Sequence, residues 1–377
     1  MKNISSFQEQ INSWCEQDSM AVALRLRERL VPVEGDGAVF FPPTYAPARK
    51  GEPSAYNVDP YGETKTVLVD SVGSQANRIE PLFMRSSKGR QNLLAELVPQ
   101  IDFNYANGKK AVSIFEVGHR LGDAFVRSTE LAGDVEEAFK KFVNGGDATE
   151  IAKLAPTSLV FGVWDSRGTH AKLPRIFQSS IRAWDVCLLT RSAQYSPPVD
   201  YVALGIFSED DKKKAEEDSK NPLAQAGFAA VPAINTHGGV CARGPIERTA
   251  TVNLVALRRL TGAGDYNQAV NLRRYILGLA LVAATIESDP FLRQGCLLVN
   301  DTKFTARWEL VERNGTVGPM DLEHDAALAY ATSAARDFGV GENREVSFTP
   351  EMAQKQAKAT KDKKKKGEDS QETQGKK

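Results

Sequence analysis

Apolar residues recur at helical spacing in several parts of the chain. Phe7, Ile11 and Trp14 start a pattern that continues among charged residues to Leu30, which predicts a helix or a pair of helices over Ile4–Leu30. A longer apolar stripe with arginines on its opposite side predicts a helix over Asn271–Ile286. Shorter helices are predicted at Ser71–Phe83, His119–Arg127 and Asp134–Val143.

Short apolar runs bounded by turn-forming residues predict strands between these helices. The runs are Thr66–Asp70, Ala111–Glu116, Ser158–Val163, Tyr201–Phe207 and the alternating Arg248–Leu257. Cys296–Val299 and Phe304–Val311 flank Asn300-Asp301, which predicts a hairpin. Ile176–Leu189 fits a helix or a strand, and Ile234–Arg243 fits a loop or a strand edge. Helices and strands interleave without strict alternation, so we expect an α+β fold with a ferredoxin-like (RRM-like) βαββαβ core.

Three segments lack a regular pattern. The prolines of Val31–Gly62 predict hairpin tips or an extended arm, and the charged run Glu209–Lys220 predicts an exposed insertion. The C-terminal segment is rich in Lys, Gln and Glu and has no aromatic residue, so a disordered tail is expected. The expected organisation is one folded unit, residues 1–349, and a lysine-rich tail, residues 350–377.

The charge balance changes this picture little. The 48 basic and 48 acidic residues give a net charge of zero, which is not the bulk signature of a nucleic-acid-binding protein. The segment Glu351–Lys377 holds nine lysines and five acids, so the rest of the chain is mildly acidic. Four scattered cysteines predict reduced thiols. With no membrane-length apolar run and no signal-like N-terminus, we expect a cytoplasmic protein without membrane contact.

The residues that usually carry catalysis are sparse. Four histidines show no metal-binding spacing, and His237 with Cys241 lacks a second ligand pair. No phosphate-binding glycine loop and no nucleophile elbow is present. We therefore expect a protein that is not an enzyme and has no metal, cofactor or catalytic residue.

Arginines and aromatic residues alternate through the middle of the chain. The arginines are Arg167, Arg175, Arg182 and Arg191, and they are interleaved with the aromatic residues Trp164, Phe177, Trp184 and Tyr195. Guanidinium groups grip phosphates and aromatic faces stack on bases, which suits RNA. Ion pairs and core packing explain the same residues. Similarly, the polar cluster Ser74–Arg78 at a helix start suits either a phosphate or an ordinary helix cap.

Three blocks of sequence occur in the same order as in a known family. They are Asp70–Glu80 (DSVGSQANRIE), Ser158–Arg175 (with SLVFGVWDSRGT and KLPR) and Leu189–Tyr195 (LTRSAQY). Together they closely resemble the backbone subunit of type I CRISPR effector complexes (Cascade), in the subtype I-G lineage, formerly I-U. The subunits of that family are RAMP-superfamily proteins, and the blocks that resemble them run from about Leu24 to Glu312.

The resemblance implies a ferredoxin-like palm with inserted finger and thumb elements. Such subunits polymerise along the CRISPR RNA (crRNA) and present it for pairing with target DNA in antiviral defence. The implied partners are the crRNA, target DNA through the guide, further copies of the chain, other effector-complex subunits and a separate helicase-nuclease. Base pairing requires that the guide be held by phosphate and sugar, leaving base edges free.

Candidate RNA-binding residues follow from the same blocks and from arginines elsewhere in the chain. They are Ser74, Gln75, Asn77, Arg78, Ser166, Arg167, Arg175, Arg182, Arg191, Arg243 and Arg248. Two alternatives stay open. One is a metal-dependent ribonuclease that uses acids such as Asp70 or Asp165. The other is an interaction protein that binds no nucleic acid.

Overall fold

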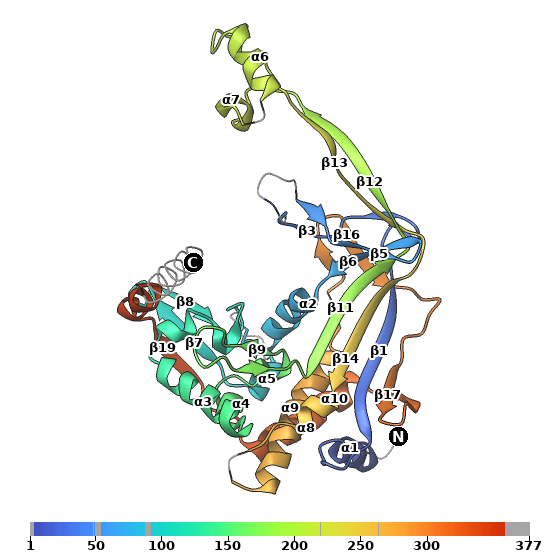
Figure 1. Ribbon diagram of the computed structural model, residues 1–377, viewed down its shortest axis with the longest axis vertical. Helices are drawn as coiled ribbons and strands as arrows, with labels where there is room; N and C mark the ends of the chain where they lie inside the picture. The colour runs from blue at the N-terminus through green and yellow to red at the C-terminus, as the bar shows by residue number, and fades with distance from the viewer. Residues whose placement is uncertain are drawn as a thin grey trace, which may run out of the picture.

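A central antiparallel sheet organises the protein. The computed structural model describes residues 4–47, 49, 54–86, 92–218, 220–262, 264–287 and 289–358. In these residues a nine-stranded sheet has helices against one face, and a two-stranded arm extends from its end (Figure 1). The expected α+β class is confirmed.

The strands of this sheet come from distant parts of the chain. They are β1 (Ala21–Pro32), β5 (Val58–Tyr61), β6 (Thr64–Asp70), β11 (Phe177–Trp184), β14 (Ile246–Asn253), β15 (Phe291–Arg293), β16 (Cys296–Asn300), β17 (Trp308–Glu312) and β18 (Val317–Met320). Their order is β15-β16-β1-β14-β11-β6-β5, with β17 also on β1 and β18 on β17. Every neighbouring pair is antiparallel.

The helix predicted over the C-terminal half of Ile4–Leu30 is wrong. Only α1 (Ile4–Ser13) is helical, and the following segment is β1. Leu24 and Leu26 point to the core while Arg25 and Arg27 point outward, which is the two-residue period of a strand. Leucine, arginine and glutamate favour helices, but β1 is paired on both edges, with β14 and with β16 and β17.

The hairpin predicted around Asn300-Asp301 is also wrong. β16 and β17 lie one after the other along the same edge of β1 instead of pairing together. β17 forms its hairpin with β18. Both strands exist as predicted, but their partner is decided by a distant strand that local sequence does not reveal.

The helices on the inner face contribute a large part of the core. These helices are α8 (Leu254–Arg258), α9 (Tyr266–Thr285) and α10 (His324–Phe338). The predicted helix over Asn271–Ile286 is confirmed, and α9 is buried on nearly all sides between the sheet and its neighbouring helices. Gly278 lies where α9 meets α10, because an added Cβ there would be 2.8 Å from Cα of Ala331. Close helix packing therefore requires a glycine at this position.

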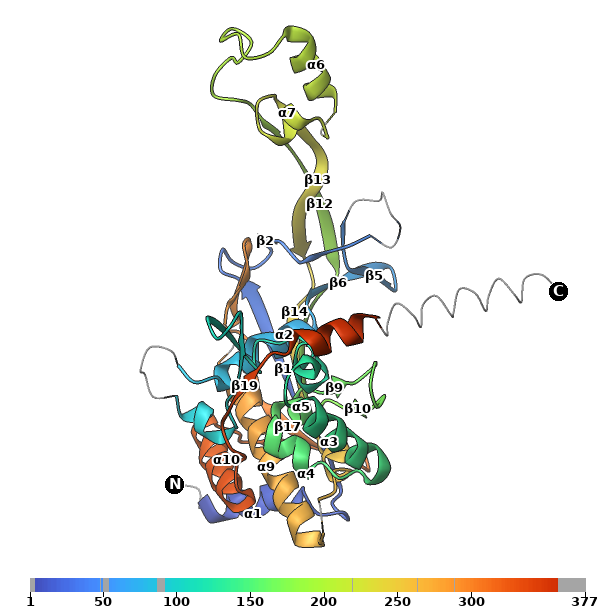
Figure 2. The same ribbon diagram turned by 90° about the vertical axis from the view of Figure 1, so that its left-hand side faces the viewer.

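A smaller lobe packs against the other side of α9 (Figure 2). It contains α3 (Ala132–Gly145), α4 (Thr149–Leu154), α5 (Thr157–Val160), β7 (Ile101–Tyr105), β8 (Lys110–Ser113) and β19 (Arg344–Ser347). Short 3₁₀ turns join these elements at η2 (Leu93–Leu97), η3 (Arg120–Gly122) and η4 (Val126–Ser128). The predicted strand Ser158–Val163 is wrong: its first residues form α5, followed by β9 (Val163–Trp164). A short, fully buried apolar run does not distinguish the two structures.

The arm consists of β12 (Val186–Tyr195) and β13 (Val231–Ala242), which continue from β11 and lead into β14. Its tip carries α6 (Glu209–Glu217) and α7 (Pro222–Gln225), so the charged insertion is exposed as expected. Ser208 and Asp211 form a capping box that starts α6. The predicted strand Tyr201–Phe207 is wrong, because this segment forms turns at the tip.

The remaining segments follow the expected pattern. Val31–Gly62 contains only short strands: β2 (Val39–Phe40), β3 (Thr44–Tyr45), β4 (Ala55–Tyr56) and β5. The chain is helical over residues 350–358, so folded structure passes the boundary expected at residue 349; the rest of the lysine-rich tail lies outside the described residues. Within the described ranges, no helix is long and apolar enough to cross a membrane.

Candidate nucleic-acid interface

A buried carboxylate organises the first of the sequence blocks, Asp70–Glu80. α2 (Val72–Ile79) starts at Ser71, whose hydroxyl accepts a hydrogen bond from the amide of Ser74, and continues into the 3₁₀ turn η1 (Glu80–Phe83). Asp70 is fully buried just before this cap. It accepts hydrogen bonds from Ser74 Oγ at 2.8 Å, Gln75 Nε2 at 2.7 Å and Arg78 Nε at 3.2 Å. Three polar side chains of α2 are therefore engaged in hydrogen bonds to Asp70.

From Asp70 the hydrogen bonds continue across the sheet. Gln75 Oε1 accepts from Ser179 Oγ at 3.0 Å, and Arg248 Nε donates to the same hydroxyl at 3.2 Å. Arg248 Nη1 then reaches Glu28 Oε2 at 3.0 Å. Gln75 and Arg248 are 3% and 4% exposed, so these two candidate RNA-binding residues lie inside the protein.

The second block forms a tight loop with outward-pointing side chains. β9 pairs with β10 (Lys172–Leu173), and the loop between them folds around Asp165. Asp165 accepts from the amides of Gly168 and Thr169 and from Arg127 Nη1. Burial opposes ionisation of this carboxyl, but these hydrogen bonds and the charge of Arg127 outweigh it and lower its pKa.

The loop held by Asp165 exposes groups that suit RNA. Ser166 and Arg167 are exposed, and Arg167 has no ion-pair partner among the residues that the structure describes. Trp164 is 57% exposed, and Lys172 Nζ lies 5.0 Å from the centre of its ring. The candidate list from the sequence omitted Trp164 and Lys172; the signal was an aromatic residue beside a polar, glycine-containing turn.

Arg120 joins the two blocks. Its Nε donates to Glu80 Oε2 at 2.6 Å, and its Nη1 donates to the carbonyl of Gly162 at 3.1 Å. Arg120 is 6% exposed and has a φ of 51°, a conformation that is costly for a residue other than glycine. Burial raises the pKa of Glu80, although Arg120 acts in the opposite direction. The end of α2 is thereby fixed to the segment that leads into β9.

Arg175 lies next to this junction and lacks a neutralising acid in the described part of the chain. Partial burial lowers the pKa of Arg175, and the like charge of Arg120 adds to this effect. Gly162 has a φ of 78°, and an added Cβ would lie 2.8 Å from Cγ of Arg175. The loop therefore requires glycine here to seat Arg175.

These groups form one candidate interface, which we call the α2–β10 surface. It comprises the exposed or half-exposed side chains of Asn77, Arg78, Trp164, Ser166, Arg167, Lys172 and Arg175. α2 and the β9–β10 hairpin lie beside each other in Figures 1 and 2. Two blocks separated by about ninety positions in the sequence are thus connected through Arg120, which bonds to Glu80 and to Gly162.

The other predicted arginines lie apart from this surface. Arg182 faces Asp59 at 3.6 Å, and Arg243 donates to Asp185 Oδ1 at 2.8 Å at the base of the arm. Arg191 is exposed halfway along β12. Arg182 and Arg243 each have an acidic partner, although the side chain of Arg243 remains largely exposed.

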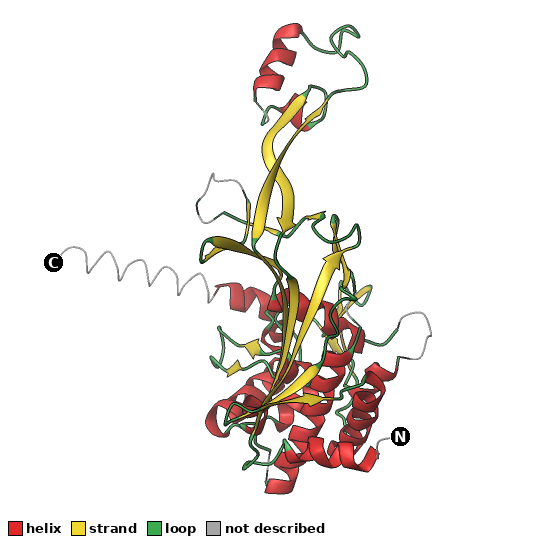
Figure 3. Ribbon diagram, turned by 90° about the vertical axis from the view of Figure 1, so that its right-hand side faces the viewer, coloured by secondary structure: helices red, strands yellow, loops and turns green. Residues whose placement is uncertain are grey.

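The outer face of the sheet differs from an RRM-type stacking platform (Figure 3). Its matched rows are Arg25–Thr251–Gln178, Arg27–Thr249–Ser180 and Arg29–Glu247–Arg182, without an aromatic residue. Arg27 is paired with both oxygens of Glu247, and Arg25 with Glu309. RRM sheets stack bases on aromatic side chains of this face. These three rows offer none, and the aromatic Trp184 at the end of β11 packs against Tyr61.

The carboxylates considered for metal binding are already occupied. Asp70 also accepts from Arg293 Nη2 at 2.8 Å, so four side chains donate to it. Asp165 has a similar set of donors, in a different loop. Among the described residues no group of three or more His, Cys, Asp or Glu side chains could hold a metal ion.

Residues 24–188 match the family model of CRISPR-associated protein GSU0053, which indicates a CRISPR-associated protein. The matched segment extends from β1 to the start of β12 and includes the whole α2–β10 surface. No curated protein matches the chain.

Proposed function

We propose that this protein is a non-catalytic backbone subunit of a type I CRISPR effector complex, of the RAMP superfamily and the subtype I-G lineage. It binds crRNA on the α2–β10 surface, assembles with further copies along the guide, and presents the guide to target DNA. The observation that carries the proposal is the position of this surface: all of it lies within the segment that matches a CRISPR-associated family.

The chemistry of the α2–β10 surface suits a guide held by its backbone. Arg167, Lys172 and Arg175 offer cations to phosphates, and Ser166 and Asn77 offer hydrogen bonds to phosphate or sugar. Trp164 offers one flat apolar face on which a base can stack. The surface contains no array of groups that would read base edges, so these edges stay free for pairing with target DNA.

The strand connectivity supports a ferredoxin-like palm. β1, β11, β14 and β17 follow one another along the chain and lie in the spatial order β17-β1-β14-β11. Helices occur between β1 and β11 and between β14 and β17, which gives the sequence βαββαβ. In this arrangement the small lobe is the finger insertion, and the β12–β13 arm is the thumb insertion.

A metal-dependent ribonuclease is the weaker alternative. It would need carboxylates with free lone pairs facing a shared ion. Asp70 and Asp165 instead accept hydrogen bonds from arginine, amide and hydroxyl donors in separate places. Degradation of the target is accordingly assigned to a separate helicase-nuclease.

The test is co-expression with a CRISPR array transcript and the partner subunits, followed by sequencing of the RNA that co-purifies. We expect protected, guide-length RNA. The double substitution Arg167→Ala/Arg175→Ala should reduce the retained RNA by roughly tenfold at moderate salt, because two phosphate contacts are lost. The matched control, Arg313→Ala/Arg336→Ala, removes two cations elsewhere and should retain RNA. Bare, monodisperse wild-type protein would contradict the proposal and favour the interaction-protein alternative.

A further inference from the structure

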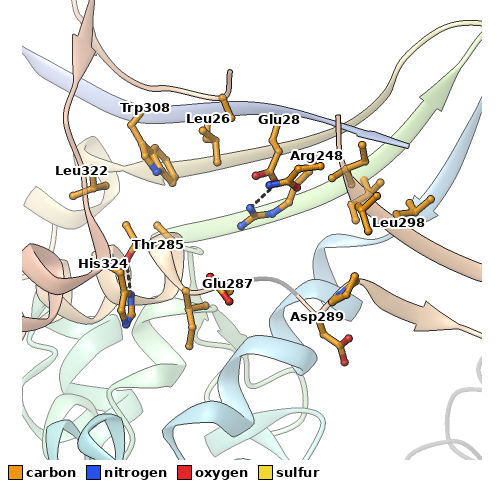
Figure 4. Close-up of a pocket in the computed structure, with 18 of the residues that line it drawn as sticks. Leu26, Glu28, Arg248, Thr285, Glu287, Asp289, Leu298, Trp308, Leu322 and His324 are labelled. Carbon is orange, nitrogen blue, oxygen red and sulfur yellow. Dashed lines mark hydrogen bonds and ion pairs between the residues drawn. The ribbon is translucent and has the colours of Figure 1, made fainter. Parts of the chain in front are cut away.

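A pocket lies between the sheet and the end of α9 (Figure 4). One of its lining residues, Leu292, accepts a hydrogen bond from Arg78 of the α2–β10 surface. Its volume is about 700 Å³. Leu26 and Leu30 of β1, Trp308 of β17 and Leu298 of β16 supply an apolar wall. Pockets of this size with an apolar lining and a few convergent polar groups are typical of binding sites.

One polar group in this pocket lacks a partner. Arg248 is 4% exposed and uses Nε for Ser179 and Nη1 for Glu28, but its Nη2 is buried and has no hydrogen-bond acceptor in the described part of the chain. A buried, unpaired donor of a charged group is costly to leave unsatisfied. Its position on the pocket wall indicates a ligand with an acceptor oxygen, such as a carbonyl group.

The remainder of the pocket carries the opposite charge. Four carboxylates line it, Glu28, Glu287, Asp289 and Glu323, against the single guanidinium of Arg248. Figure 4 shows Glu287 and Asp289 across the space from Glu28 and Arg248. Glu28 is neutralised by Arg248, whereas Glu287 and Asp289 are exposed and have no ion-pair partner among the described residues. Repulsion from this acidic rim disfavours a phosphate backbone.

We propose that this pocket binds a basic peptide segment of a protein partner. A backbone carbonyl accepts from Arg248 Nη2, apolar side chains pack on Leu26, Leu30 and Trp308, and a lysine or arginine reaches Glu287 and Asp289. We assign a peptide because one ligand has to present a carbonyl, an apolar group and a cation to three different walls of the pocket, and a peptide carries all three. This inference does not depend on RNA binding.

The probe is a blocked tetrapeptide, acetyl-Leu-Lys-Leu-Lys-amide, with its glutamate counterpart as the ligand control. Binding is followed in 0.15 M salt by calorimetry and by the fluorescence of Trp308, which lines the pocket. We expect the lysine peptide to bind and the glutamate peptide not to bind. In parallel, free L-lysine and L-arginine test a small-molecule ligand; binding of either as tight as the peptide would overturn the peptide assignment.

Substitutions at the exposed rim avoid disturbing the buried Arg248–Glu28 pair. Glu287→Lys/Asp289→Lys should weaken peptide binding by more than about tenfold, because two attractive charges become repulsive. The matched control is Glu209→Lys/Asp210→Lys on α6, which makes the same charge change on the arm and should alter affinity less than about twofold. Equal affinity of the rim variant and wild type, or no binding of any probe at millimolar concentration, would refute the proposal. Guide retention by the rim variant reports separately on the RNA function.

Discussion

The buried ion pair between Arg120 and Glu80 connects the candidate interface to the core. Arg120 Nη2 is buried and has no hydrogen-bond partner among the residues that the structure describes. Removing one member of such a pair leaves the other charge buried and unpaired, which usually costs more than the pair itself contributes. Arg120→Ala should therefore lower the free energy of unfolding by about 3–5 kcal/mol.

Urea denaturation of Arg120→Ala and of the double variant Arg120→Leu/Glu80→Leu tests this expectation. The double variant should be less destabilised than Arg120→Ala, because neither charge remains in the interior. Equal stability of Arg120→Ala and wild type would show that Glu80 does not need its partner.

The reactivity of each cysteine should depend on how deeply it is buried. Burial raises the pKa of Cys15 to about 12 and that of Cys296 to about 11, so both thiols stay protonated near neutral pH. Cys187 and Cys241 are half-buried on the arm. N-ethylmaleimide at pH 7 should label Cys187 and Cys241 first, and all four cysteines only after unfolding, as mass spectrometry of peptides would show. Labelling of native Cys15 as fast as Cys187 would contradict this.

The raised pKa values of the Cys15 and Cys296 thiols predict that the protein loses stability at alkaline pH. The folded state holds the Cys15 proton more tightly than the unfolded chain, whose thiol has a pKa near 9.0. Stability is therefore retained below pH 9 and declines as the pH rises towards 12. Denaturation midpoints measured from pH 7 to 11 should decline less steeply for Cys15→Ala than for wild type.

Among the elements, the loop from Gly162 to Arg175 most directly links fold and proposed function. Gly162→Ala places a Cβ 2.8 Å from Arg175 Cγ and 3.1 Å from the carbonyl oxygen of Leu173, at a φ of 78°. We expect a loss of about 1–3 kcal/mol in stability and weaker RNA retention, because Arg175 must move. Gly145→Ala on α3 is the matched control, since nothing lies within 4 Å of its added Cβ. Thermal denaturation of both variants compares them, and an unchanged Gly162→Ala protein would show that the loop adapts.

Predictions for single elements succeeded where the signal was local. The N-cap Ser71 and the apolar stripe of α9 are read correctly from neighbouring residues. β1 and the β16–β17 pair were misread because their structure depends on partners more than 200 positions away. Propensity gives the wrong result when pairing on both edges stabilises a strand made of helix-forming residues.

At the scale of the whole molecule, the candidate site was only partly predictable. Three polar blocks could be recognised in the sequence, but Arg248 and Arg175 look alike there. The fold buries Arg248 on the inner face of β14 and leaves Arg175 exposed at the start of β11. Exposure depends on which face of the sheet a residue occupies, and this is known only after register and helix packing are fixed.

The arm should fold largely independently of the body. Its tip has its own small cluster of Ala215, Ala224 and Ala229, separate from the main core. Replacing residues 190–238 by a short Gly-Ser turn should leave the melting temperature of the body within a few degrees of wild type. RNA-dependent assembly, followed by size-exclusion chromatography, should be reduced. Unfolding of the shortened protein would show instead that the arm stabilises the sheet.

Because the arm is long, a small rotation at its root would displace its tip by a larger distance. β13 has 12 residues, which at about 3.3 Å per residue place the tip about 40 Å from the sheet. A rotation of about 5° at the root would displace the tip by about 3–4 Å, about the length of one residue of the strand. Gly244 lies at this root, and a Cβ there would be 2.7 Å from the carbonyl oxygen of Trp184. The backbone at Gly244 therefore packs closely against that of Trp184, and a residue larger than glycine here would have to shift the base of the arm.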